Sequence, residues 1–240
     1  KITERENPFM GYLLTIEAPD ASGKSTQSDL LCRKLKECGI PVYEHRFPNY
    51  GSNACKPVED YLSGVLGSDP ADTGAYAASV FFAVDRYFSY RTDWKKELDR
   101  EDSVVLLDRY TTSNAIHQLA KISEDSEKTA FLDWLYDFEF GKLALPVPDD
   151  TIFLDVPPEV SFTLMKKRAE ADKKHFTDIH EANKDYLVQC YRAARFAAKA
   201  KNWHTVACTR NGVMRPIDDI GDEIFAYVSE RIKEKRKESE

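Results

Sequence analysis

The stretch EAPDASGKST, residues 17–26, decides the fold, because its last four residues are typical of a phosphate-binding loop. Such loops follow the pattern G-x-x-x-x-G-K-[ST], and here Ala18 stands at the first glycine position and Gly23 at the second. An apolar strand is predicted before the loop, at 12–16, and a helix after it, over about 24–38. A chance GKS in an ordinary strand–turn–helix is the alternative, and the flanking elements favour a nucleotide-binding loop.

The chemistry of such a loop comes mainly from its backbone. N–H groups point at phosphate oxygens, and the start of the following helix adds the positive end of its dipole. Lys24 is expected to hold the β- and γ-phosphates, and Ser25 is expected to coordinate Mg²⁺. The candidate ATP-binding residues are Ala18, Pro19, Asp20, Ala21, Ser22, Gly23, Lys24, Ser25 and Thr26.

Apolar strands alternate with helical segments along the rest of the chain. Further strands are predicted at 41–46, 103–108, 151–156 and 203–208. Helices are predicted at 53–67, 73–99, from 112, at 125–140, from 158, at 179–201 and from 216. The alternation predicts an α/β protein of the P-loop NTPase fold, with a five-stranded parallel sheet and helices on both faces. The charged segment over about 166–178 is expected to be a mobile lid. We expect one domain over 1–240, in which 1–9 form a flexible leader.

Composition narrows the class of protein. The 240 residues carry a formal net charge of −7, which argues against a broad nucleic-acid surface. The five cysteines are scattered and form no CxxC pair, so we expect reduced thiols in a cytoplasmic protein. No apolar segment has the length of a membrane span. The first residues do not show the cationic region followed by an apolar region that would indicate a signal peptide.

Several motifs together resemble one family, the thymidylate kinases. The matching stretches are EAPDASGKSTQ (17–27), RFP (46–48), FFAVDR (81–86), DRYTTSNAIHQ (108–118), FLDVPPE (153–159) and DIHEANKDYL (178–187). They cover nearly the whole chain in the expected order, although the family usually has glycine at position 18. The resemblance implies phosphoryl transfer from ATP to dTMP with Mg²⁺ in dTTP biosynthesis. It also implies a homodimer, whose interface is expected at the helices before and after Pro70.

The base of the acceptor is expected to meet side chains from two helices. Phe82 and Arg86 lie four residues apart and share a helical face, so a ring could stack on a base while a guanidinium binds its carbonyl. By resemblance, Phe82 stacks on thymine and Arg86 binds its O4. The alternative is a core phenylalanine and an arginine paired with Asp85 or another acid. Asn114 and Gln118 are again four apart and could bind the same base edge, or could be ordinary polar helix residues.

Two arginines follow predicted strands, where ligands of open α/β sheets bind. Arg46 and Arg109 suit a phosphate dianion through bidentate hydrogen bonds. Asp108, at the end of a buried strand, is a candidate Mg²⁺ ligand, or a structural carboxylate that positions Arg109. By resemblance, the substrate-binding residues are Asp20, Arg46, Phe47, Lys56, Phe82, Arg86, Arg109, Asn114 and Gln118, with Asp20 at the 3′-hydroxyl.

The predicted lid is rich in cations. Some members of the family carry an arginine just after the loop aspartate, where this chain has Ala21, and others supply the charge from the lid. We therefore expect Arg168 to act in catalysis, with Lys173 or Lys174 as alternatives, or the segment to be an ordinary charged helix. The catalytic set is then Lys24, Arg46, Arg109, Arg168 and Mg²⁺.

Two other functions remain open. The chain could be a P-loop kinase for another nucleoside monophosphate or for a deoxynucleoside, for which Glu44 near the end of the second strand would be a candidate base. It could also be a nucleotide-binding regulator without catalysis, a reading supported only by Ala18.

Overall fold

The computed structural model describes residues 11–20, 22–171, 179–180 and 183–238. A parallel sheet forms its centre, with the strand order β2-β3-β1-β4-β5. Its strands are β1 (Tyr12–Glu17), β2 (Val42–Arg46), β3 (Val104–Asp108), β4 (Asp150–Asp155) and β5 (His204–Ala207). Every pairing in this sheet is parallel, which confirms the predicted five-stranded parallel sheet.

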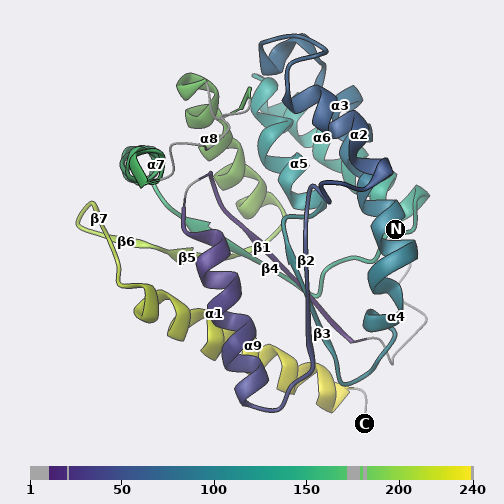
Figure 1. Cartoon of the computed structure of the whole chain (residues 1–240), viewed down its shortest axis with the longest axis vertical. Helices are drawn as coiled ribbons and strands as arrows, with labels where there is room; N and C mark the ends of the chain where they lie inside the picture. The colour runs from purple at the N-terminus through teal and green to yellow at the C-terminus, as the bar shows by residue number, and fades with distance from the viewer. Residues whose placement is uncertain (1–10, 21, 172–178, 181–182, 239–240) are drawn as a thin grey trace.

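Helices cover both faces of this sheet (Figure 1). The α-helices are α1 (Lys24–Glu37), α2 (Lys56–Leu62), α3 (Ala75–Ser89), α4 (Lys95–Leu98), α5 (Thr111–His117), α6 (Asp125–Tyr136), α7 (Pro158–Ala171), α8 (Lys184–Ala200) and α9 (Ile217–Glu238). Short turns of 3₁₀-helix lie at η1 (Asn53–Cys55), η2 (Pro70–Asp72) and η4 (Leu119–Lys121). Single π-helical segments, η3 (Tyr90–Trp94) and η5 (Asp137–Lys142), continue α3 and α6.

The strand residues alternate between the two faces of the sheet, as the two-residue period of a strand requires. Leu14 and Ile16 of β1 pack with α1 and α9 on one face. Leu13 of β1 and Phe153 of β4 face the opposite side, where α5, α6 and α8 join one cluster and η3 and α4 another. Because the central strands β1 and β3 are buried on both faces, they are nearly continuous apolar runs, whereas the edge strand β2 carries polar, partly exposed residues.

Some predicted boundaries were wrong. The helix predicted over 53–67 ends at Leu62, because the chain turns at Gly64, where φ is +83°. The helix predicted from 179 begins at Lys184, capped by the Asn183 side chain, which accepts from the N–H of Tyr186 at 3.0 Å. A small antiparallel hairpin, β6 (Thr209–Arg210) and β7 (Val213–Met214), was not predicted, since two-residue strands have no readable period.

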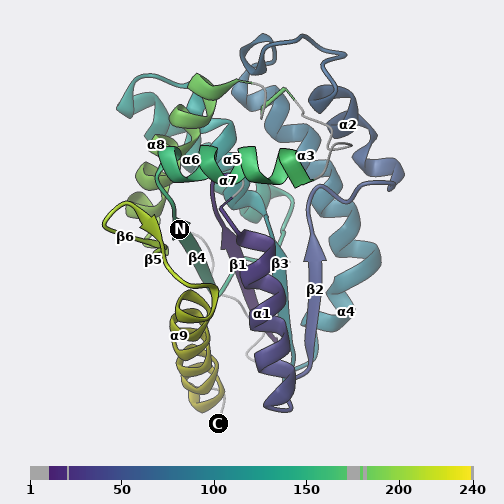
Figure 2. The same ribbon diagram turned by 60° about the vertical axis from the view of Figure 1, so that its left-hand side comes forward.

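The carboxyl ends of the five strands meet at one edge of the sheet, where α1 and α5 begin. Figure 2 shows α7 running across this edge near the start of α1. No helix in the described part of the chain is long and apolar enough to cross a membrane.

Candidate active site

The phosphate loop connects β1 to α1 at the carboxyl edge of the sheet. Gly23 has a φ of +79°, a left-handed conformation that favours glycine. Ala18 is fully buried in the core beside Ile16, and it is not among the described residues with positive φ. The position therefore does not require glycine, and alanine adds packing there. Ser22 closes the loop by donating its hydroxyl to the Pro19 carbonyl at 2.5 Å, and Ala21 lies outside the described residues.

Three side chains converge on Asp108 at the end of β3. The ammonium of Lys24 contacts its carboxylate, and Arg46 Nε lies 3.8 Å from Asp108 Oδ2. The Ser25 hydroxyl donates to the same oxygen at 3.4 Å. Burial, followed by the positive charge of Arg109, lowers the pKa of Lys24, and the anionic phosphates of a bound nucleotide would favour its charged form again.

Ser25 and Asp108 fit a magnesium ion. They present two oxygen atoms on one side of the phosphate loop, and Mg²⁺ binds through one or two protein oxygens together with phosphate oxygens. Among the described residues, no group of three or more histidines, cysteines or acids could hold a metal by itself. Ser25 and Asp108 could therefore hold a metal together with the phosphate oxygens of a nucleotide.

Arg109 occupies the turn after β3 in an uncommon backbone conformation, with a φ of +71°. Its guanidinium pairs with Asp20 of the phosphate loop and donates from Nη1 to His117 Nε2 at 3.1 Å. Burial alone would raise the pKa of Asp20, but Arg109 outweighs this effect, so the pKa of Asp20 lies below its ordinary value. Burial also lowers the pKa of His117 to about 4, which keeps the ring neutral as an acceptor.

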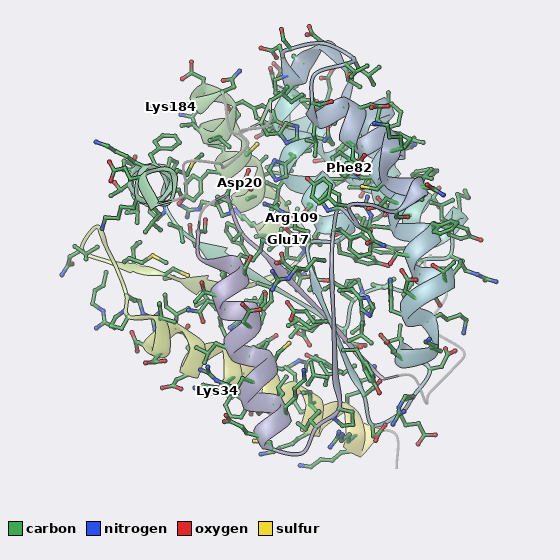
Figure 3. All side chains as sticks on the ribbon, in the orientation of Figure 1. Glu17, Asp20, Lys34, Phe82, Arg109 and Lys184 are labelled. Atoms are coloured by element: carbon green, nitrogen blue, oxygen red, sulfur yellow. The ribbon has the colours of Figure 1, made fainter. Side chains whose placement is uncertain are left out.

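A buried carboxylate, Glu17 at the end of β1, holds the turn in this conformation. It accepts the backbone N–H of Tyr110 at 3.1 Å and the hydroxyls of Thr112 and Ser113 at 2.7 and 2.8 Å. Hydrogen bonds from a buried side chain to the neighbouring backbone and side chains can hold a strained turn in place. Figure 3 shows Glu17, Asp20 and Arg109 together at the carboxyl edge of the sheet, with Phe82 facing them from α3.

One cavity of about 350 Å³ opens on the α3 side of this group. Its lining includes most of the predicted acceptor residues, together with His117 and His180. The predicted ones are Asp20, Arg46, Phe47, Phe82, Arg86, Arg109, Asn114 and Gln118. Phe82 is half-buried and meets the Tyr61 ring edge-on at 6.0 Å, whereas Arg86 is buried in an ion pair with Glu139. The alternative considered for Arg86, pairing with an acid, is therefore realised, although the residue still lines the cavity.

A second cavity of about 480 Å³ opens on the opposite side of the phosphate loop. Beyond the loop, the start of α1 and Arg109, the walls of this cavity come from α7, the hairpin region and the start of α9. They are Leu164, Cys208, Met214, Arg215, Ile217 and Ile220. The sequence did not indicate this wall. Asp20, Lys24, Ser25 and Arg109 line both cavities, so two ligands bound in them would meet at these four residues.

Lys56 is a predicted substrate-binding residue that does not join this group in the structure. Lys56 is absent from the lining of the acceptor-side cavity, and its ammonium binds Asp60 at 2.7 Å on its own helix. The backbone of Arg168 lies in α7, but its side chain is outside the described part of the chain, as are Lys173 and Lys174. The roles of these lid cations stay predictions.

A parallel sheet with a phosphate loop, and two cavities that meet at its lysine, define a P-loop phosphotransferase. The family model for thymidylate kinase matches residues 16–215. A protein named thymidylate kinase from Mycobacterium tuberculosis (strain CDC 1551 / Oshkosh) is 31% identical over 193 residues, covering 80% of this chain and 87% of the relative. Another from Afipia carboxidovorans is 33% identical over 190 residues, covering 77% and 78%. The chain belongs to the thymidylate kinase family.

Proposed function

We propose that this protein transfers the γ-phosphoryl group of ATP to dTMP and forms dTDP and ADP. One observation carries the proposal: the loop cavity and the acceptor-side cavity share Asp20, Lys24, Ser25 and Arg109. A phosphoryl group held by Lys24 from one side therefore faces an acceptor held by Arg109 from the other. Such an arrangement lowers the entropic cost of bringing the two reactants together.

The chemistry requires charge stabilisation rather than a base. The attacking oxygen of a nucleoside monophosphate is already anionic, so the barrier comes from repulsion between two anions and from their orientation. We assign the reacting phosphoryl group to Lys24, and the acceptor phosphate to Arg46 and Arg109. Mg²⁺, held with the nucleotide by Ser25 and Asp108, would neutralise charge on the β- and γ-phosphates. Arg168 remains our proposed lid cation.

A deoxynucleoside kinase fits the site less well. Its acceptor is a hydroxyl, which needs a carboxylate base. The candidate base, Glu44, accepts two hydrogen bonds from Arg46, at 2.8 and 3.1 Å, and it is absent from the lining of the acceptor-side cavity. The cations that line the same cavity support a phosphorylated acceptor instead.

The test is ADP release by the purified protein with ATP and Mg²⁺, with dTMP, dUMP, dCMP, AMP and thymidine offered in parallel. The proposal expects strong turnover with dTMP and little with thymidine, which lacks the phosphate. Turnover with thymidine alone would support a nucleoside kinase. ATP binding without turnover on any acceptor would support a non-catalytic regulator.

We also propose a homodimer formed through α3. Large apolar side chains lie along one exposed face of this helix and are between 37% and 49% exposed. They are Tyr76, Val80, Val84, Tyr87 and Phe88. A continuous apolar stripe of this kind typically marks a contact surface, and a second copy of α3 would cover it symmetrically. Val84→Glu is expected to shift the mass measured by light scattering from dimer to monomer, and an unchanged mass would contradict this interface.

The cellular location follows as part of the same proposal. All five cysteines are free thiols, and four of them are buried. Such thiols suit a reducing compartment, which supports the cytoplasm.

A further inference from the structure

Glu139 is a fully buried carboxylate that no sequence motif indicated. It lies in the π-helical segment η5, which continues α6, and its side chain is 0% exposed. A buried carboxylate is costly unless it is paired and hydrogen-bonded, and Glu139 meets both conditions. It accepts from Arg86 Nε at 2.7 Å and from Arg86 Nη2 at 2.5 Å, and from the Thr111 hydroxyl at 2.7 Å.

Glu139 also fixes the orientation of a neighbouring amide. Asn114 Nδ2 lies 3.3 Å from Glu139 Oε1 and 3.2 Å from the Ser79 carbonyl. An ionised carboxylate and a backbone carbonyl can only accept hydrogen bonds. The Asn114 nitrogen must therefore face them, and its oxygen must be the atom left for the cavity that Asn114 lines.

The same contact orients the Arg86 guanidinium. Glu139 occupies Nε and Nη2, and Nη1 makes no hydrogen bond with any described residue. Arg86 lines the same cavity as Asn114. The pair therefore offers the cavity one donor, Arg86 Nη1, and one acceptor, Asn114 Oδ1.

We propose that Glu139 sets this donor–acceptor order and thereby selects a 4-keto pyrimidine as the acceptor base. A 4-keto pyrimidine carries a carbonyl oxygen beside an N3–H, which complements a donor beside an acceptor. A 4-amino pyrimidine carries an N–H₂ donor beside an N3 acceptor, and it mismatches at both positions. Glu139 acts as a positioning residue, because it holds the two residues that touch the base. This inference rests on the proposed function.

The side chain of Gln118 gives a second reason to expect a polar ligand at this wall of the acceptor-side cavity. It lies one turn after Asn114 and is 0% exposed, yet neither its side-chain oxygen nor its nitrogen has a hydrogen-bond partner in the described part of the chain. A buried amide without partners is costly, so its persistence in a cavity wall points to a ligand that satisfies it. A base edge with both donor and acceptor atoms meets that need.

The experiment measures kcat and KM for dTMP, dUMP and dCMP at saturating ATP and Mg²⁺. The wild-type protein is expected to prefer dTMP to dCMP by about 10³-fold or more, since a site built on hydrogen bonds strongly rejects a mismatched analogue. In Glu139→Gln, the new side-chain N–H₂ can donate a hydrogen bond to Asn114. The Asn114 amide can then flip and present its nitrogen, rather than its oxygen, to the cavity. We expect the dTMP-to-dCMP preference to fall by about tenfold or more, mainly through KM for dTMP, with KM for ATP unchanged.

Thr111→Val is the matched control. It removes one hydrogen bond to the same carboxylate but leaves the charge of Glu139 and the donors of Asn114 intact. Its dTMP-to-dCMP preference is expected to equal that of the wild-type protein. A Glu139→Gln protein that loses activity equally on dTMP and dCMP, with an unchanged preference, would overturn the proposal and leave Glu139 a structural residue.

A second measurement applies if Glu139→Gln fails to fold. The wild-type protein is titrated calorimetrically with dTMP, dCMP and N3-methyl-dTMP, which lacks the N3–H. The proposal expects both analogues to bind much more weakly than dTMP, and equal binding of all three would overturn it. Failure of the proposed function can be told apart from failure of the Glu139 proposal. If the proposed function is wrong, the wild-type protein binds these nucleotides but does not turn over dTMP.

Discussion

Replacement of Arg109 by alanine tests the shared wall of the two cavities. Its side chain is 19% exposed, and its guanidinium pairs with Asp20, whose side chain is 14% exposed. We expect two charge-assisted hydrogen bonds to the acceptor phosphate to be lost, each worth about 1.5–3 kcal/mol. The sum of about 3–6 kcal/mol corresponds to a loss in kcat/KM of about 10²- to 10⁴-fold. Alanine at this position would have to adopt the same positive φ as Arg109, so the substitution does not relieve the backbone strain.

The same change has a calculable effect on stability. Asp20 would keep its partly buried carboxylate without its principal partner, at a cost of about 1–3 kcal/mol. The protein should therefore remain folded while losing turnover. The assay combines steady-state kinetics for dTMP with urea unfolding. Arg100→Ala is the control, because Arg100 is 54% exposed and its Nε lies 3.7 Å from the exposed carboxylate of Asp102. Turnover of Arg109→Ala within about threefold of the wild-type value, below the smallest loss a single charged hydrogen bond gives, would refute the assignment.

Three further predictions follow from the site. Phe82→Ala should raise KM for dTMP by about tenfold, because stacking and burial are lost. KM for ATP should stay unchanged, because Phe82 lines the acceptor-side cavity and not the loop cavity. Equal rises in KM for both nucleotides would indicate a core residue. Gly23→Ala should lower the free energy of unfolding by about 1–2 kcal/mol through its φ alone, since no atom of the described residues lies within 4 Å of the added carbon. An unchanged free energy in urea unfolding would contradict this. The folded-state pKa of His117, about 4, lies below the ordinary 6.5, so the unfolded chain binds the extra proton and stability falls as pH drops through this window. Between about pH 7 and about pH 5 the free energy of unfolding falls by about 2 kcal/mol through this group, and His117→Gln should remove that part of the pH dependence. Identical stability–pH profiles for the wild-type and variant proteins would disprove the prediction.

The fold was predictable because its determinants are local. Strands β1 and β3 are short, mostly apolar runs that are fully buried, and the phosphate loop is a contiguous motif between a strand and a helix. The end of α2 was not predictable in the same way. Gly64 and Gly67 are both possible stops, and the conformation of the chain decides between them.

The candidate site was predictable only where its chemistry lies in motifs. All four residues of GKST, together with Phe82 and Arg86 of FFAVDR and Asp108 and Arg109 of DRY, line one or both cavities. Glu139 was missed because it is 53 residues from Arg86 in the chain, as their ion pair shows, and because one acid in a charged helix gives no signal. Lys56 illustrates the opposite situation, in which a predicted ligand residue has a partner within its own helix. Its basic charge suggested a phosphate ligand, but Asp60 lies four residues later on the same helix and takes the ion pair.

The central claim is that a phosphoryl group passes between two bound nucleotides across the wall formed by Lys24 and Arg109. The most direct test is to follow the γ-phosphorus of ATP by ³¹P NMR with the purified protein, Mg²⁺ and dTMP. We predict that dTDP and ADP form in equal amounts without free phosphate. Release of inorganic phosphate in place of dTDP would contradict the account, because the phosphoryl group would then reach water rather than the second cavity.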